Sequence, residues 1–179
     1  MKSSRRRSRE FALQAIYQWQ LAGQSVGDIE KQYADADGFA SADVPLFQLL
    51  VKSAIKNSEA LSVQLTPHLD RPWHEVSPIE RGIMLLGAIE LTTMPETPYR
   101  VIINEAIELA KSFGGTDGHK YVNGVLDKLA AVVRADEIAG QNENPTPRKP
   151  RAEGMKVPAT PTVTVKARRV TKVSKVGGN

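Results

Sequence analysis

Five basic residues stand close together at the start of the chain, with no acid among the first nine positions: Lys2, Arg5, Arg6, Arg7 and Arg9. The arginine guanidinium is a planar set of donors that grips phosphate in a bidentate manner and stacks on bases. Cations at a helix N-terminus oppose the helix dipole, so a cluster there favours a function outside folding. The segment therefore predicts contact with a nucleic acid, and a solvated run of charge is the alternative.

Residues 114–121 (GGTDGHKY) are a second segment that could bind a polyanion. A glycine-rich turn leads into a predicted helix whose first residues include Lys120 and Tyr121. Backbone N–H groups at a helix start bind phosphate, and an aromatic ring beside a cation can stack on a base. The segment is not a P-loop, because neither the glycine spacing nor a following Lys-Ser/Thr is present. An ordinary capped turn between two helices is the alternative.

Catalysis and metal binding find little support in the sequence. Glu105 and Glu108 lie on one face of a predicted helix, where paired carboxylates could do acid–base work, but a solvated helix face is the simpler interpretation. The three histidines stand at no ligand spacing, and the absence of cysteine excludes disulfides and thiolate sites. We therefore expect no enzyme activity, no metal and no cofactor.

The formal net charge of +4 is unevenly distributed. Residues 1–9 carry +5, residues 10–140 carry −8, and residues 141–179 carry +7. Clustered cations at both ends favour a polyanion as the partner. No run of 18 apolar residues could cross a bilayer, and the N-terminus lacks the apolar core of a secretory signal, so we expect a cytoplasmic protein with no membrane association.

Apolar residues recur at helical spacing through most of the chain, which predicts an all-α fold, a compact bundle of about six or seven helices. The clearest start signal is Ser77-Pro78-Ile79-Glu80, with a capping serine, a proline at the first helical position and a glutamate three residues after the cap. Helices are predicted at about residues 4–22, 25–33, 44–65, 77–93, 98–113 and 117–133, with a loop at 34–43.

The composition changes after about residue 139. Prolines, glycines and scattered basic residues dominate from there on, and no aromatic residue occurs in 145–179. Such a segment cannot bury enough apolar surface to offset the entropy of ordering. The sequence therefore predicts a helical domain at 1–139 and a disordered basic tail at 140–179, for which we expect a nonspecific tethering role on polyanions.

Several blocks of the sequence resemble the NusB family of transcription antitermination factors. Residues 103–114 (INEAIELAKSFG) and 119–127 (HKYVNGVLD) are similar to its most distinctive blocks, and residues 5–10 and 15–21 are similar to its opening. The resemblance extends over about residues 3–135. One departure is at residues 88–91 (AIEL), where the family often has Leu-Tyr-Glu-Leu, so that Ile89 replaces an aromatic residue.

The resemblance implies two small helical subdomains and a protein that is not an enzyme. Such a protein binds the boxA element of nascent RNA jointly with NusE, a small-subunit ribosomal protein, so that RNA polymerase reads through terminators, notably in ribosomal RNA operons. It implies that Tyr17 and Glu80 face NusE, and that Asp117 borders the RNA surface. The residues implied to contact RNA are Arg5, Arg6, Arg7, Arg9, Lys120 and Tyr121.

Two other interpretations remain open. Helical domains similar to NusB also occur at the front of RNA cytosine methyltransferases, although no glycine-rich cofactor motif or catalytic cysteine follows here. The chain could also be a protein–protein module, including a homodimer that hides its RNA face.

Overall fold

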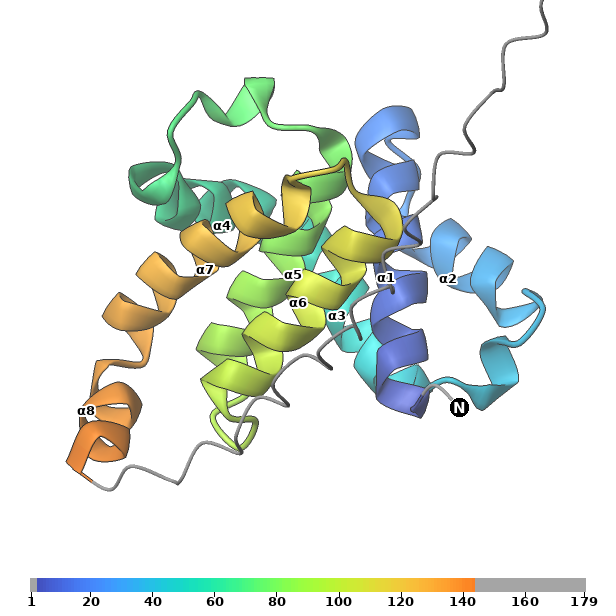
Figure 1. The fold of residues 1–179 in the computed structure, drawn as a ribbon. Helices are drawn as coiled ribbons and strands as arrows, with labels where there is room; N and C mark the ends of the chain where they lie inside the picture. The colour runs from blue at the N-terminus through green and yellow to red at the C-terminus, as the bar shows by residue number, and fades with distance from the viewer. Residues whose placement is uncertain (1–2, 144–179) are drawn as a thin grey trace, which may run out of the picture. The chain divides into compact units, whose positions relative to one another are not determined.

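The structure, a computed structural model, describes residues 3–143 of the backbone and the side chains up to Gly140. It contains eight α-helices and three short 3₁₀ helices in these residues, and no strand (Figure 1). The α-helices are α1 (Ser4–Ala22), α2 (Val26–Ala34), α3 (Val44–Lys56), α4 (Ser58–Leu65), α5 (Pro78–Thr93), α6 (Tyr99–Phe113), α7 (Gly118–Val133) and α8 (Ala135–Glu143). The 3₁₀ helices are η1 (Phe39–Ser41), η2 (Thr66–His68) and η3 (Trp73–Glu75). The predicted all-α class is confirmed.

The helix ends follow the local signals of the sequence. The Ser3 hydroxyl accepts the Arg6 N–H at 3.2 Å to start α1, and the Ser77 hydroxyl accepts the Glu80 N–H at 3.2 Å to start α5. Helix α1 ends at Gly23, whose φ of 64° is left-handed and favours glycine. These caps satisfy backbone groups that a helix end leaves unpaired, and they fix where each helix begins and ends.

The structure differs from the predicted helices in three places. The single helix expected at 44–65 is divided at Asn57, whose φ of −111° and ψ of 17° depart from helical values. After the division, α4 buries Leu61 and Leu65. The expected loop at 34–43 contains η1, with Phe39 buried. Helix α8 continues past residue 139, and the remainder of the predicted tail, residues 144–179, lies outside the described residues.

Helix α5 is central to the fold. It packs against α1 and α3 on one side and against α6 and α7 on another, with α4 nearby (Figure 1). Its residues 82–91 are all buried, including Ile89 at the position where the family often has an aromatic residue. Leucine, isoleucine and methionine fill this region, and their burial supplies the main stabilisation of the fold.

We predict that Gly87→Ala destabilises the protein by about 1–3 kcal/mol, the usual cost of overpacking a core. A Cβ at Gly87 would lie 2.6 Å from Leu126 Cδ1, because α5 and α7 approach closely at this point. Urea denaturation would measure the change. Gly124→Ala on α7 is the control, since a Cβ there would meet nothing within 4 Å. Equal stability of the two variants would contradict the close approach.

Candidate nucleic-acid interface

The N-terminal arginines are arranged along the first turns of α1, and most of them already have partners. Arg6 donates from Nη2 to Glu108 Oε2 on α6 at 3.2 Å, and its side chain is 28% exposed. Arg7 donates to the Ser41 hydroxyl in η1. Arg5 is partly buried, and its Nε has no hydrogen-bond partner. Arg5, Arg6 and Arg7 therefore remain partly accessible at one end of α1.

Arg9, which is also expected to contact RNA, lies in a different environment from Arg5, Arg6 and Arg7. It is 4% exposed. Its Nε and Nη2 donate to the two carboxylate oxygens of Glu90 at 2.8 and 2.6 Å, and its Nη1 lies 3.7 Å from Glu105 Oε2. Burial alone would lower the pKa of Arg9, but the hydrogen bond and charge of Glu90 raise it above its ordinary value. Arg9 thus joins α1 to α5 and α6 inside the protein.

The second half of α6 continues the cationic surface. Lys111 Nζ donates to Glu108 Oε1 at 2.8 Å, so the same carboxylate that accepts from Arg6 also accepts from Lys111. Phe113 ends the helix and is 37% exposed. Residues 114–117 then lead directly into α7. Helix α6 therefore connects the arginine end of α1 with the start of α7.

The start of α7 carries the second predicted group. Lys120 Nζ lies 2.8 Å from Asp117 Oδ1, and both side chains are more than 70% exposed. Their hydrogen bond and mutual attraction raise the pKa of Lys120 and lower the pKa of Asp117. Tyr121 is partly buried, and the Arg71 guanidinium lies over its ring at 4.8 Å. Burial, followed by the charge of Asp70, raises the pKa of Tyr121.

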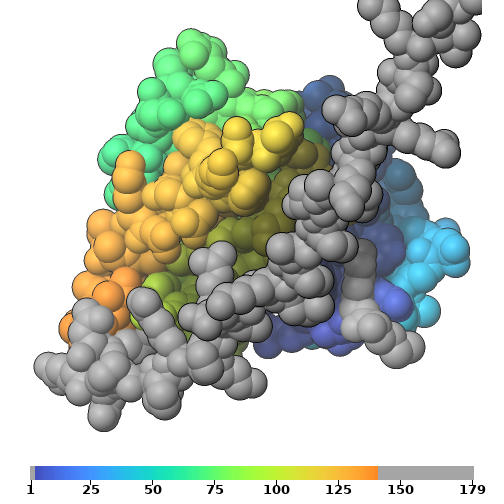
Figure 2. Space-filling model, in the orientation of Figure 1, coloured from blue at the N-terminus to red at the C-terminus, as the bar shows by residue number. Residues whose placement is uncertain are grey.

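These groups lie along connected helices of one part of the molecule. Helices α6, α7 and part of α1 are exposed on the same face (Figure 2). Arg6 and Lys111 meet at Glu108, while Arg71, Lys120 and Tyr121 gather at the start of α7. These four cations are paired with carboxylates of the protein. An anionic ligand would therefore compete with those carboxylates for them.

Tyr17 on α1 and Glu80 at the start of α5 are the two residues expected to face a protein partner. Tyr17 is 37% exposed, and Leu21, one turn further along α1, is 64% exposed. Gln20 donates to the Pro78 carbonyl at 3.0 Å and joins the two helices. Glu80 also packs against the start of α7, since a Cβ at Gly118 would lie 2.8 Å from Glu80 Oε1.

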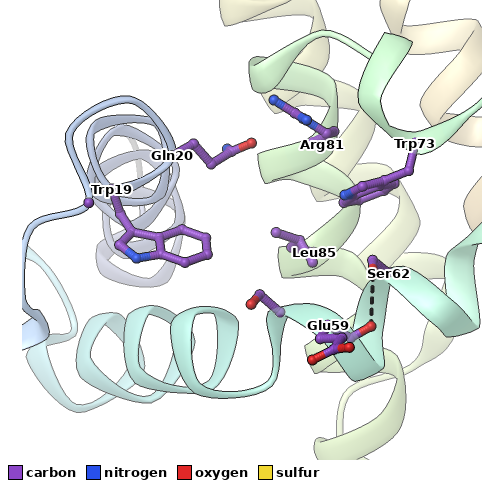
Figure 3. A pocket seen from close by; sticks show the side chains of 9 residues that line it. Trp19, Gln20, Glu59, Ser62, Trp73, Arg81 and Leu85 are labelled. Atoms are coloured by element: carbon purple, nitrogen blue, oxygen red, sulfur yellow. Dashed lines mark hydrogen bonds between the residues drawn. The ribbon is translucent and has the colours of Figure 1, made fainter.

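A pocket of about 420 Å³ opens beside the contact of α1 with α5 (Figure 3). Trp19 from α1 and Trp73 from η3 lie on opposite sides of it, and Leu85 from α5 lies between them in the view. Arg81, one residue after Glu80, also lines the pocket, and its Nε is buried without a hydrogen-bond partner. The pocket therefore combines two tryptophan rings and Leu85 with polar residues such as Glu59 and Ser62, and it contains a buried donor without a hydrogen-bond partner.

Sequence reasoning missed three residues of this surface: Arg71, Lys111 and Phe113. Arg71 lies between helices, where no periodic pattern predicts its neighbours. Lys111 and Phe113 belong to residues 103–114, which resemble the family as a block. The i, i+3 spacing of Lys111 from Glu108 indicates that these two side chains can pair on one helix face.

Two other features are absent from the described residues. None of the helices there is long and apolar enough to cross a membrane. No group of three or more histidine, aspartate or glutamate side chains in the same residues could hold a metal ion.

The fold and this surface define an all-helical protein whose cations are displayed from the starts of α1 and α7 and the end of α6. The NusB family model matches residues 6–131. The transcription antitermination protein NusB of Dechloromonas aromatica (strain RCB) is 53% identical over 142 residues, which are 79% of this chain and 87% of that protein. The chain therefore belongs to the NusB family, whose members are transcription antitermination proteins.

Solved structures agree with this assignment. The structure of T. maritima NusB has a TM-score of 0.64 and 26% sequence identity, covering 74% of this chain and 94% of that one. A crystal structure of the antitermination factors NusB and NusE in complex with double-stranded RNA has a TM-score of 0.58 and 22% identity. The match covers 69% of this chain and 93% of that one. The second likeness establishes the shared fold.

Proposed function

We propose that this protein binds single-stranded, boxA-type RNA jointly with NusE, and thereby promotes read-through by RNA polymerase, notably in ribosomal RNA operons, in the cytoplasm. The observation that carries the proposal is the meeting of Arg6 and Lys111 at Glu108, which joins the arginine end of α1 to the helix that leads into Lys120 and Tyr121. The NusB crystallised with NusE and double-stranded RNA has the same fold, which supports RNA as a ligand and NusE as a partner.

The residues of the face divide by chemistry. Arg5, Arg6, Arg7 and Lys120 supply charge for phosphates, which gives affinity with little dependence on sequence. Tyr121 supplies an aromatic ring for an unpaired base, and the Arg71 guanidinium that lies over this ring would hold it in place. Asp117 borders the surface and holds Lys120 in position.

We place NusE on the neighbouring surface. Tyr17 and Leu21 offer exposed apolar area, and Glu80 offers a carboxylate at the start of α5. Exposed aromatic side chains are frequent anchors of protein interfaces. Because Glu80 packs against Gly118 at the start of α7, a protein bound there would reach the edge of the RNA surface.

Binding measurements with purified NusE test the proposal. We expect the pair to bind a single-stranded boxA oligonucleotide more tightly than a scrambled strand or a boxA duplex, as measured by fluorescence anisotropy at fixed salt. Four to six phosphate contacts give a log–log salt slope of roughly −3 to −4 for single strands. Equal affinity for all three RNAs, or a response independent of salt, would refute it. Light scattering of the free protein reports whether a homodimer competes with the complex.

A further inference from the structure

The carboxylate of Glu108 holds two cations from different helices at the same time. Its Oε2 accepts from Arg6 Nη2 of α1 at 3.2 Å, and its Oε1 accepts from Lys111 Nζ of α6 at 2.8 Å. The hydrogen bond from Lys111, followed by the one from Arg6, lowers the pKa of Glu108 below its ordinary value. The side chain is therefore an anion at neutral pH.

All three side chains can be reached by a large ligand. The side chains of Arg6, Glu108 and Lys111 are 28%, 41% and 52% exposed, respectively. Exposed ion pairs of this kind are weak, because water and salt screen them. A ligand that offers equivalent acceptors can therefore displace the carboxylate without disturbing the core.

The ligand with equivalent acceptors is a phosphodiester. Like a carboxylate, it presents two terminal oxygens that share one negative charge, and it accepts hydrogen bonds from arginine and lysine. We infer that the Glu108 carboxylate binds Arg6 and Lys111 in place of one RNA phosphate. It keeps the two cations together in the free protein and competes with RNA for them. This inference rests on the proposed RNA-binding function and assigns Glu108 a role within it.

The competition has a definite consequence for selectivity. Phosphates are the same in every RNA, so displacement of Glu108 weakens binding to all sequences by the same factor. The preference for one sequence, which bases determine, is unchanged. Glu108 thus lowers the affinity for RNA in general and leaves sequence recognition, together with the protein partner, to decide which RNA is held.

Glu108→Gln is the direct test, because it removes the charge and keeps the shape and one acceptor. We expect a three- to tenfold increase in affinity for the boxA strand and for the scrambled strand alike, and a salt slope steeper by up to roughly 0.7. The matched control is Glu96→Gln, which makes the same change in net charge at an exposed position before the start of α6. The control should change the affinity for either RNA strand by less than about 1.5-fold, since exposed charges more than roughly 10 Å apart are screened from each other by salt.

The measurement is fluorescence anisotropy with the full chain, with and without NusE, supported by thermal melts of each variant. Unchanged or weaker binding by Glu108→Gln would overturn the inference, since a carboxylate that only positioned the two cations would lose affinity when replaced. If that variant melts early, Glu108→Ala is used with the same expectation. Loss of boxA preference in the wild-type complex would instead refute the proposed function. The inference is tested separately, because it concerns the affinity of the variant relative to that of wild type, measured on each RNA.

Discussion

Replacing Arg9 with alanine should lower the free energy of unfolding by about 3–5 kcal/mol, the usual cost of breaking a buried ion pair by removing one partner. Glu90 is only 2% exposed, and its carboxylate now accepts two hydrogen bonds from Arg9. The change would leave this buried carboxylate without both of them. It would also leave a space between α1, α5 and α6. Urea denaturation followed by circular dichroism measures the loss.

A double variant separates the ion pair from the space it fills. Arg9→Met with Glu90→Leu removes both charges and keeps most of the volume, so it should recover a large part of the lost stability. RNA affinity of the folded double variant should stay within about threefold of wild type, because Arg9 is inside the protein. A stable Arg9→Ala variant that binds RNA poorly would show that Arg9 belongs to the RNA surface after all.

Replacing both Arg6 and Arg7 with alanine should weaken RNA binding by about 100-fold, which corresponds to two charge-assisted hydrogen bonds of roughly 1.5 kcal/mol each. The log–log salt slope should become shallower by roughly 1.4, since two phosphate contacts are lost on a single strand. The loss should be similar for boxA and scrambled strands. Anisotropy titrations at three or more salt concentrations give both quantities.

Stability should change little in this variant, by roughly 0–1 kcal/mol per pair, because the bonds of Arg6 to Glu108 and of Arg7 to Ser41 are near the surface. The matched control replaces Lys31 and Lys56, two exposed cations on α2 and α3, with alanine. It removes the same charge from another surface and should retain most of the affinity. Equal loss in both variants would mean that only the net charge matters.

Much of the fold could be predicted because its determinants are local. Ser77-Pro78 acts on backbone groups within a few residues, and the cap predicted there is present. Ser3 and Gly23 act in the same local way at the two ends of α1. The division at Asn57 was not predictable in the same way. It depends on how Leu61 and Leu65 reach the core, and the periodic pattern of residues 44–65 is compatible with one helix or two.

The candidate site could be predicted only in part, for the same reason. Residue type and clustering point to Arg6, Arg7, Lys120 and Tyr121, but they cannot show which cation has a partner far away in sequence. Arg9 meets Glu90, 81 residues further on, and becomes part of the interior. Arg71, in a segment without a pattern, meets Tyr121 only after the chain has folded.

Helix α5 also bears on how the two proposed binding surfaces influence each other. Because it packs against α1 and α3 as well as α6 and α7, a shift of one group relative to the other would have to break close-packed contacts along its length. We therefore expect NusE to affect RNA binding through adjoining contacts at Glu80 and Gly118, as one scaffold presents both ligands side by side. Cooperativity of this kind comes from the free energy of direct contacts between the two bound ligands and requires no change of conformation in this protein.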